Sequence, residues 1–147
     1  MKFVIANDHA AIELKKTLKK WLESEGHEVT DLGAATGESV DYPDKAVEAA
    51  KVFLAGGYDH GIVCCGTGIG ISITANKVKG IRCALPQNAY AAAMAKEHNN
   101  CQFIAFGGRI EYPQPPVEML KAYLDAEYGG TDRHDRRVNK IMSAEEI

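Results

Sequence analysis

The chain lacks the features that mark membrane-spanning and secreted proteins. No apolar run in it approaches the roughly eighteen residues that a membrane-spanning helix needs. The apolar stretch 1–6 is too short for the core of a signal peptide, and the polar residues Asn7 and Asp8 follow it at once. We therefore expect a cytoplasmic protein that does not insert into a membrane.

An excess of positive charge and a pattern of metal ligands are also missing. The 17 basic and 20 acidic side chains give a net charge of −3, which offers no footprint for nucleic acid or an anionic membrane. The 4 cysteines and 5 histidines show none of the paired spacings that zinc sites use. Adjacent Cys64 and Cys65 would form a strained disulfide. We expect reduced thiols and no bound metal ion.

What the chain does contain is a regular alternation of short apolar strands and amphipathic helices. Its 147 residues, 46% of them hydrophobic, suffice for one domain, 1–147, with a substantial core. We predict strands at 2–6, 28–32, 58–65, 81–85 and 103–106, and helices at 11–25, 44–55, 71–78, 88–97, from 113–116 to 127, and at 133–142. Asp44 and Asp132 are the predicted caps of their helices. This order predicts an α/β fold, with helices on both faces of a five-stranded parallel sheet.

The loop after the third predicted strand is the most distinctive segment. Cys65 ends an apolar run, glycines follow at positions 66, 68 and 70, and a helix can begin near Ile71. This order aims backbone N–H groups at a point beside the positive end of a helix dipole, so we expect an anionic group, or one that becomes anionic, to bind there. The helix N-terminus would lower the pKa of Cys65 below the free value of about 8.5 and make it a usable base or nucleophile.

The glycines alone are also compatible with a tight turn that binds no ligand. They do not match the dinucleotide fingerprint, because their spacing is G-x-G-x-G and Pro86 stands where an acidic residue would be expected. A Walker phosphate loop is excluded, because no Gly-Lys-Ser/Thr follows. Cys65 is the unusual feature, although most buried cysteines are inert.

Polar residues follow three of the predicted strands. Ligands of parallel sheets bind at the carboxyl ends of the strands. Asp8 and His9 come after the first strand, Cys65–Gly70 after the third and Arg109 after the fifth. Simpler roles exist, because Asp8 can cap the first helix and His98-Asn99-Asn100 can end a helix, where asparagine tolerates the left-handed turn. The common edge predicts a binding site.

Arg133 and Arg137 lie four residues apart in the last predicted helix. They therefore share one face of it, although like charges at this spacing repel each other weakly. A solvated basic face explains the pair. A phosphate ligand explains it as well, since guanidinium groups bind phosphate through paired N–H donors.

A cysteine base, a loop of main-chain amides, histidines and a pair of arginines fit one reaction class. Removal of a proton next to a carbonyl group gives an enediolate, whose anionic oxygen needs preorganised donors. One base can take the proton from one carbon and return it to the neighbouring carbon. This is aldose–ketose isomerisation, which needs neither a metal nor an organic cofactor.

Nine motifs carry a resemblance to a known family. They are Asn7-Asp8-His9-Ala10-Ala11, Asp41-Tyr42-Pro43, the segment from Cys65 to Ser72, Ala75-Asn76-Lys77, Gly80-Ile81-Arg82, His98-Asn99-Asn100, the segment from Ala105 to Arg109, Arg133-His134 and Arg137-Val138. Together they cover nearly the whole chain in order. The sequence resembles the ribose-5-phosphate isomerase B family, which also includes galactose-6-phosphate isomerase subunits. The resemblance implies a Rossmann-like three-layer sandwich.

The resemblance also implies roles for individual residues. Cys65 would be the catalytic base, Thr67 would assist it, and His98 would open the sugar ring, a step that His9 can share. The anion hole for the enediolate would be formed by Gly66, Thr67, Gly68, Ile69 and Gly70. The sugar hydroxyls would be bound by Asp8, His9 and Asn99, and the phosphate by Arg109, Arg133 and Arg137. The site would combine residues of two subunits in a homodimer or a dimer of dimers, with the helix 133–142 reaching the neighbouring subunit.

The resemblance leaves the substrate open. Leu85-Pro86-Gln87 departs from the family pattern after the fourth strand, where a difference can face the substrate. Ribose 5-phosphate is the first candidate. A six-carbon sugar phosphate, such as allose 6-phosphate or galactose 6-phosphate, and a free aldose are alternatives. So are a subunit that needs a different partner chain and a non-catalytic nucleotide-binding module.

Overall fold

Five parallel strands form the centre of the computed structural model, which describes residues 1–147. The strands are β1 (Lys2–Asn7), β2 (Glu28–Asp31), β3 (His60–Cys65), β4 (Cys83–Ala84) and β5 (Phe103–Gly107). Their order across the sheet is β2-β1-β3-β5-β4, and each neighbouring pair is parallel. The predicted α/β fold is therefore confirmed.

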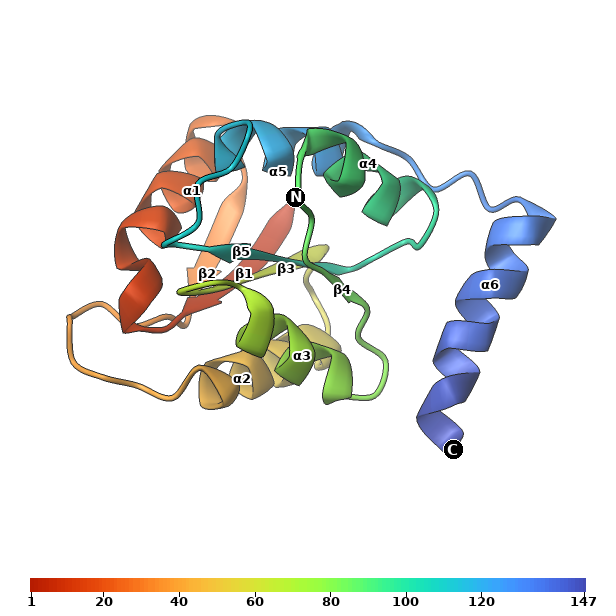
Figure 1. Cartoon of the computed structure of the whole chain (residues 1–147), viewed down its shortest axis with the longest axis horizontal. Coiled ribbons are helices and arrows are strands. Elements are labelled where there is room, and N and C mark those ends of the chain that lie inside the picture. The colour runs from red at the N-terminus through yellow and green to blue at the C-terminus, as the bar shows by residue number, and fades with distance from the viewer.

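Helices cover both faces of the sheet. They are α1 (Ile12–Ser24), α2 (Tyr42–Leu54), α3 (Ile69–Lys77), α4 (Ala89–Glu97), α5 (Pro116–Asp125) and α6 (Asp132–Ser143). Figure 1 shows α1, α4 and α5 on one face and α2 and α3 on the other, whereas α6 stands apart from these layers at the end of an extended segment. None of the helices combines the length and the apolar character needed to cross a membrane.

The strands are apolar on both faces because both faces are covered. Successive side chains of a strand point to opposite sides. Phe3 and Ile5 of β1 therefore join the core beneath α1, α4 and α5, while Val4 and Ala6 join the core beside α2 and α3. The result is two hydrophobic cores, one on each side of the sheet.

The start of α2 differs from the prediction. The helix begins at Tyr42, two residues before Asp44, and Asp41 occupies the cap position without a side-chain bond to the helix. Pro43 accounts for the earlier start, because its fixed φ suits the first turn of a helix. Asp44 instead lies in the first turn, where a negative charge favours the helix dipole.

The last helix and the fourth strand also differ. α6 is capped by Thr131, whose hydroxyl accepts a hydrogen bond from the His134 N–H, rather than by Asp132. The fourth strand is only Cys83–Ala84 instead of 81–85, because it pairs with β5 alone and lies at the edge of the sheet.

A polar cluster holds the long loop after β2 against the carboxyl end of β1. Asn7 Nδ2 and Lys15 Nζ each donate a hydrogen bond to the Ala34 carbonyl at 3.2 Å. Lys15 also forms a 2.9 Å ion pair with Asp31. A Cβ at Gly33 would lie 1.6 Å from Asn7 Oδ1, so no larger residue fits at this position. These contacts bring the following loop, 35–41, to the edge where the polar residues gather.

Candidate active site

The carboxyl ends of the three central strands meet at one edge of the sheet. Asn7 of β1 pairs with Cys64 of β3, and Cys65 pairs with Gly107 of β5. The residues that follow these strands are therefore neighbours, as the sequence predicts. They are Asp8, His9, the loop 66–70 and Arg109.

Cys65 and Cys64 point to opposite faces of the sheet. Cys64 is fully buried in the core beneath α1, and this burial raises the pKa of its thiol. Cys65 belongs to the core beside α2 and α3 and keeps 4% of its surface exposed. The Gly68 N–H donates a hydrogen bond to Cys65 Sγ at 3.2 Å. Of the two cysteines, Cys65 is thus the one whose sulfur lies against the glycine loop.

The glycine loop leaves main-chain donors unused. Gly68 has a φ of 79°, a left-handed conformation that favours glycine, and it starts α3. Gly70 packs under the ring of Tyr42, which would lie 2.4 Å from a Cβ at this position. The N–H groups of Thr67, Gly70 and Ile71 have no hydrogen-bond acceptor within the chain. An anion at the positive end of α3 could accept from these donors.

Arg109 lies beside the loop. Its N–H donates a hydrogen bond to the Gly66 carbonyl at 2.9 Å, and its Cδ and Nη1 lie 3.6 Å from where a Cβ of Gly66 would be. The residue is exposed, and its guanidinium group forms no ion pair within the chain. It is therefore free to bind an anionic ligand at this edge.

Asp8 and His9 are held in defined orientations. Asp8 caps the short 3-10 turn His9–Ala11, since its Oδ1 accepts a hydrogen bond from the Ala10 N–H at 2.9 Å. His9 Nδ1 accepts a hydrogen bond from the Val40 N–H at 3.3 Å. The neutral His9 ring must then carry its proton on Nε2, which leaves Nε2–H as a donor to a ligand.

His98 and Asn99 lie at another place, the carboxyl end of α4. With the segment 84–88 they line a cavity of about 510 Å³. The His98 ring packs against the ring of His134 on α6, and the ring centroids are 4.4 Å apart. This contact places the start of α6 beside the end of α4.

Arg133 and Arg137 flank His134 on α6. Both are exposed, and neither forms an ion pair within the chain. Burial, followed by the charges of His98, Arg133 and Arg137, lowers the pKa of His134. His134 thus lies next to two guanidinium groups that form no ion pair.

The structure thus sorts the predicted site residues into two groups. The first group contains Asp8, His9, Cys65, Gly66, Thr67, Gly68, Ile69, Gly70 and Arg109. The second group contains His98, Asn99, Arg133 and Arg137. The first group reaches a cavity of about 330 Å³ through Thr67 and Ile69. The second group reaches the cavity of about 510 Å³ through His98 and Asn99. The segment 85–87 lines both cavities and stands between them.

Three contacts here carry no signal in local patterns of the sequence. They are the Val40 bond to His9, the packing of Tyr42 on Gly70, and the bonds of Arg82 to the end of α4. Tyr42 and Arg82 stand in motifs that contribute to the family resemblance. That resemblance is the one signal that could have singled them out.

The chain matches the family model described as Ribose/Galactose Isomerase over residues 3–141. It belongs to this family, and the predicted enzyme class of aldose–ketose isomerases is confirmed with it. A curated relative, the D-erythrulose-4-phosphate isomerase of Pectobacterium atrosepticum, is 44% identical over 131 residues, which are 88% of this chain and 86% of the relative. Ribose-5-phosphate isomerase B of Escherichia coli is 37% identical over 145 residues, 99% of this chain and 97% of the relative.

Solved structures of the same family superpose on the whole chain. Ribose-5-phosphate isomerase B of Clostridium thermocellum has a TM-score of 0.94 and 43% identity, and the match covers 99% of this chain and 98% of that one. The enzyme of Mycoplasma genitalium, with bound ribulose-5-phosphate, has a TM-score of 0.90 and 35% identity, with 99% and 96% covered. The fold of this chain therefore matches that of solved family members along nearly its full length.

Proposed function

We propose that the chain interconverts ribose 5-phosphate and ribulose 5-phosphate through an enediolate, with Cys65 as the base. The position of the Cys65 sulfur carries this proposal best. It accepts a hydrogen bond from the Gly68 N–H at 3.2 Å, in a loop where the N–H groups of Thr67, Gly70 and Ile71 have no acceptor. Relatives named ribose-5-phosphate isomerase B, one of them with bound ribulose-5-phosphate, support the five-carbon substrate.

In the proposed reaction one base serves both carbons. The Cys65 thiolate takes the proton from C2 of the open-chain aldose, and the C–H electron pair becomes the C1–C2 double bond. The negative charge moves to O1, where the main-chain donors of the loop stabilise it, and Thr67 assists. The thiol returns the proton to C1 while the proton on O2 passes to O1. The products are ribulose 5-phosphate and the original thiolate.

The remaining groups prepare and hold the substrate. Ribose 5-phosphate exists mainly as a furanose, so its ring must open first. We assign the proton transfer that opens it to His98, and His9 is the alternative. Asp8, His9 and Asn99 bind the sugar hydroxyls. Three arginines without ion pairs bind the phosphate: Arg109, Arg133 and Arg137.

A complete site then needs two copies of the chain. Within one copy Thr67 of the Cys65 loop and His98 line different cavities. Helix α6 stands apart from the layers around the sheet (Figure 1), and its residues Arg133 and Arg137 are exposed. In a two-fold symmetric dimer each site would take the first group from one subunit and the second group from its partner. We therefore propose a homodimer, or a dimer of dimers, with shared sites.

Co-expression of two defective variants tests the shared site. Cys65→Ala removes a residue of the first group and His98→Asn one of the second, so a mixed dimer has one site with both lesions and one intact site. Random pairing should restore about a quarter of the wild-type rate, measured with limiting ribose 5-phosphate. The matched control pairs Cys65→Ala with Arg109→Ala, both of the first group, and should restore nothing. Equal recovery in both pairs would contradict the shared arrangement.

A steady-state panel tests the substrate. The panel compares ribose 5-phosphate with erythrose 4-phosphate, allose 6-phosphate, galactose 6-phosphate and free ribose. We expect kcat/KM for ribose 5-phosphate to exceed that for free ribose by at least about 100-fold, because the arginines would lose their phosphate. The four-carbon substrate is the second candidate, since one relative at 44% identity is named for erythrulose 4-phosphate. A higher kcat/KM for erythrose 4-phosphate would overturn the five-carbon assignment.

A further inference from the structure

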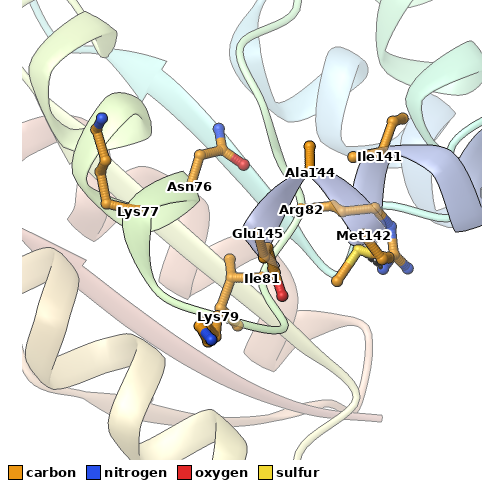
Figure 2. A pocket seen from close by; sticks show the side chains of 9 residues that line it. All are labelled: Asn76, Lys77, Lys79, Ile81, Arg82, Ile141, Met142, Ala144 and Glu145. Carbon is orange, nitrogen blue, oxygen red and sulfur yellow. Dashed lines mark hydrogen bonds between the residues drawn. The ribbon is translucent and has the colours of Figure 1, made fainter. Parts of the chain in front are cut away.

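Arg82 joins three segments that are distant in the sequence. It follows Ile81, immediately before β4, and its guanidinium group uses all three nitrogens. Nε donates a hydrogen bond to the Asn99 carbonyl at 2.9 Å, and Nη2 donates to the Asn100 carbonyl at 2.7 Å. Nη1 lies 3.1 Å from Met142 Sδ on α6. Figure 2 shows the Arg82 and Met142 side chains together at one side of the cavity between α6 and the body of the protein.

The end of α4 needs such a partner. The last carbonyl groups of a helix accept no hydrogen bond from within the helix, so they need donors from elsewhere. Asn100 is the one non-glycine residue with a positive φ, at 46°, so the chain makes a sharp turn directly after His98 and Asn99. Arg82 supplies donors to the carbonyls on both sides of this turn. A planar fork of donors suits two adjacent acceptors, which a single ammonium group cannot bridge in the same way.

Arg82 itself is firmly held. Its N–H donates a hydrogen bond to Gln102 Oε1 at 2.8 Å, and its carbonyl accepts one from the Phe103 N–H at 3.2 Å. Gln102 Nε2 donates to the Gly80 carbonyl at 2.7 Å. The guanidinium group therefore projects from the edge of the sheet rather than from a loose loop. Its hydrogen bonds fix the turn at Asn100 relative to the sheet.

We propose that Arg82 is the positioning residue for the second half of the site. It sets the orientation of His98 and Asn99 by clamping the two carbonyls after His98, and it ties this turn to the helix that carries Arg133 and Arg137. The role of His98 in this statement rests on the proposed function. Arg82 touches neither the substrate nor the reacting atoms in this scheme, and acts through the backbone it holds.

The test uses two variants of Arg82 and one matched control. Arg82→Lys keeps the charge but loses the fork, and Arg82→Ala removes both. We expect kcat/KM for ribose 5-phosphate to fall by about 10- to 100-fold in each, because misplacement of a catalytic group by about 1 Å costs this much. Lys79→Ala breaks only the 3.1 Å ion pair from the same loop to Glu146 at the C-terminus, and should leave the rate unchanged. Wild-type kinetics in Arg82→Lys would overturn the proposal.

Chemical rescue separates positioning from a general loss of structure. Guanidinium chloride at a low, non-denaturing concentration should raise the activity of Arg82→Ala severalfold by occupying the vacated site. It should not raise the activity of Arg82→Lys, whose side chain fills that space. Rescue of neither or of both variants contradicts a clamp made by the guanidinium fork.

The ring signals of His98 give a readout that does not depend on its catalytic role. In protein with isotope-labelled histidine, Arg82→Lys should shift the His98 ring resonances, while the resonances of the distant His27 stay unchanged. The His98→Asn variant assigns the signals. Unchanged His98 signals would overturn the proposal even if the enzyme had another substrate. A wild-type enzyme inactive on ribose 5-phosphate would overturn only the proposed function.

Discussion

Replacement of Cys65 by alanine is expected to abolish isomerisation while the protein remains folded. In the proposed reaction the same sulfur takes the proton from C2 and returns it to C1, so its loss would remove both steps. General base catalysis contributes about 10²- to 10⁴-fold, and we expect the upper end of this range. The change removes one sulfur atom from the core beside α2 and α3, so the folded structure should persist with a loss of about 1 kcal/mol. Steady-state rates with ribose 5-phosphate and a thermal unfolding curve measure the two effects.

Cys64→Ala is the matched control for this prediction. The two cysteines are neighbours in β3, but Cys64 faces the opposite core, where burial raises the pKa of its thiol and keeps it protonated. Its replacement should therefore preserve turnover and affect stability alone. Near-normal turnover of Cys65→Ala, or an equal loss in both variants, would remove Cys65 from the role of base.

Solvent isotope exchange adds a direct view of the proton. A thiol that holds the proton between the two carbons can exchange it with water, so product formed in D2O should carry deuterium. A hydride shift between C1 and C2 would carry none. Deuterium at C1 of the product would therefore exclude a hydride shift and support proton transfer through an enediolate.

The second large effect is expected from His98→Asn, which should slow the conversion of ribose 5-phosphate by about 100-fold, the range typical for loss of a general acid. The physical reason is that the variant would lack the proton transfer that opens the furanose ring of the substrate. Ribulose 5-phosphate is already an open chain, because its O5 carries the phosphate and cannot attack C2. In the proposed reaction, exchange of its C1 hydrogens with D2O needs only enolisation by Cys65. That exchange should stay within about fivefold of the wild-type rate.

His9→Asn is the matched comparison, because His9 is the alternative ring-opening group. His9 belongs to the first group of site residues and holds its Nε2–H free as a donor. Suppose that His9→Asn slows the conversion of ribose 5-phosphate but not the exchange of ribulose 5-phosphate, and that His98→Asn does not show this difference. Ring opening then belongs to His9. Equal losses of conversion and exchange in His98→Asn would show that this histidine orients the substrate rather than opens its ring.

Local patterns of the sequence were sufficient for the elements and for the central loop. Apolar runs of four to eight residues between amphipathic helices predicted the parallel sheet, which the structure confirms. The loop from Cys65 to Gly70 was predictable because a strand, alternate glycines and a helix start are neighbours in the chain. The side of the sheet that Cys64 and Cys65 each face follows from the alternation of a strand. These features depend on residues within one or two turns of each other.

Helix starts and the length of an edge strand were harder to predict. Asp44 and Asp132 both have the chemistry of a cap, yet α2 starts earlier at Tyr42 and Thr131 caps α6. A helix cap stabilises a helix by about 1 kcal/mol. Neighbouring candidate caps differ in this free energy by only a fraction of that amount. Tertiary packing decides among them.

By itself the sequence determined the layers of the fold, the glycine loop with Cys65 at its mouth, and the gathering of Asp8 and Arg109 at the same edge. Only the tertiary structure decided that His98 and α6 lie away from this edge, and that Arg82 clamps the turn at Asn100. The physical reason is the separation along the sequence of the residues that make contact. Periodicity and capping report contacts within an element, whereas a guanidinium group that reaches two carbonyls some 17 and 18 residues away leaves no periodic trace.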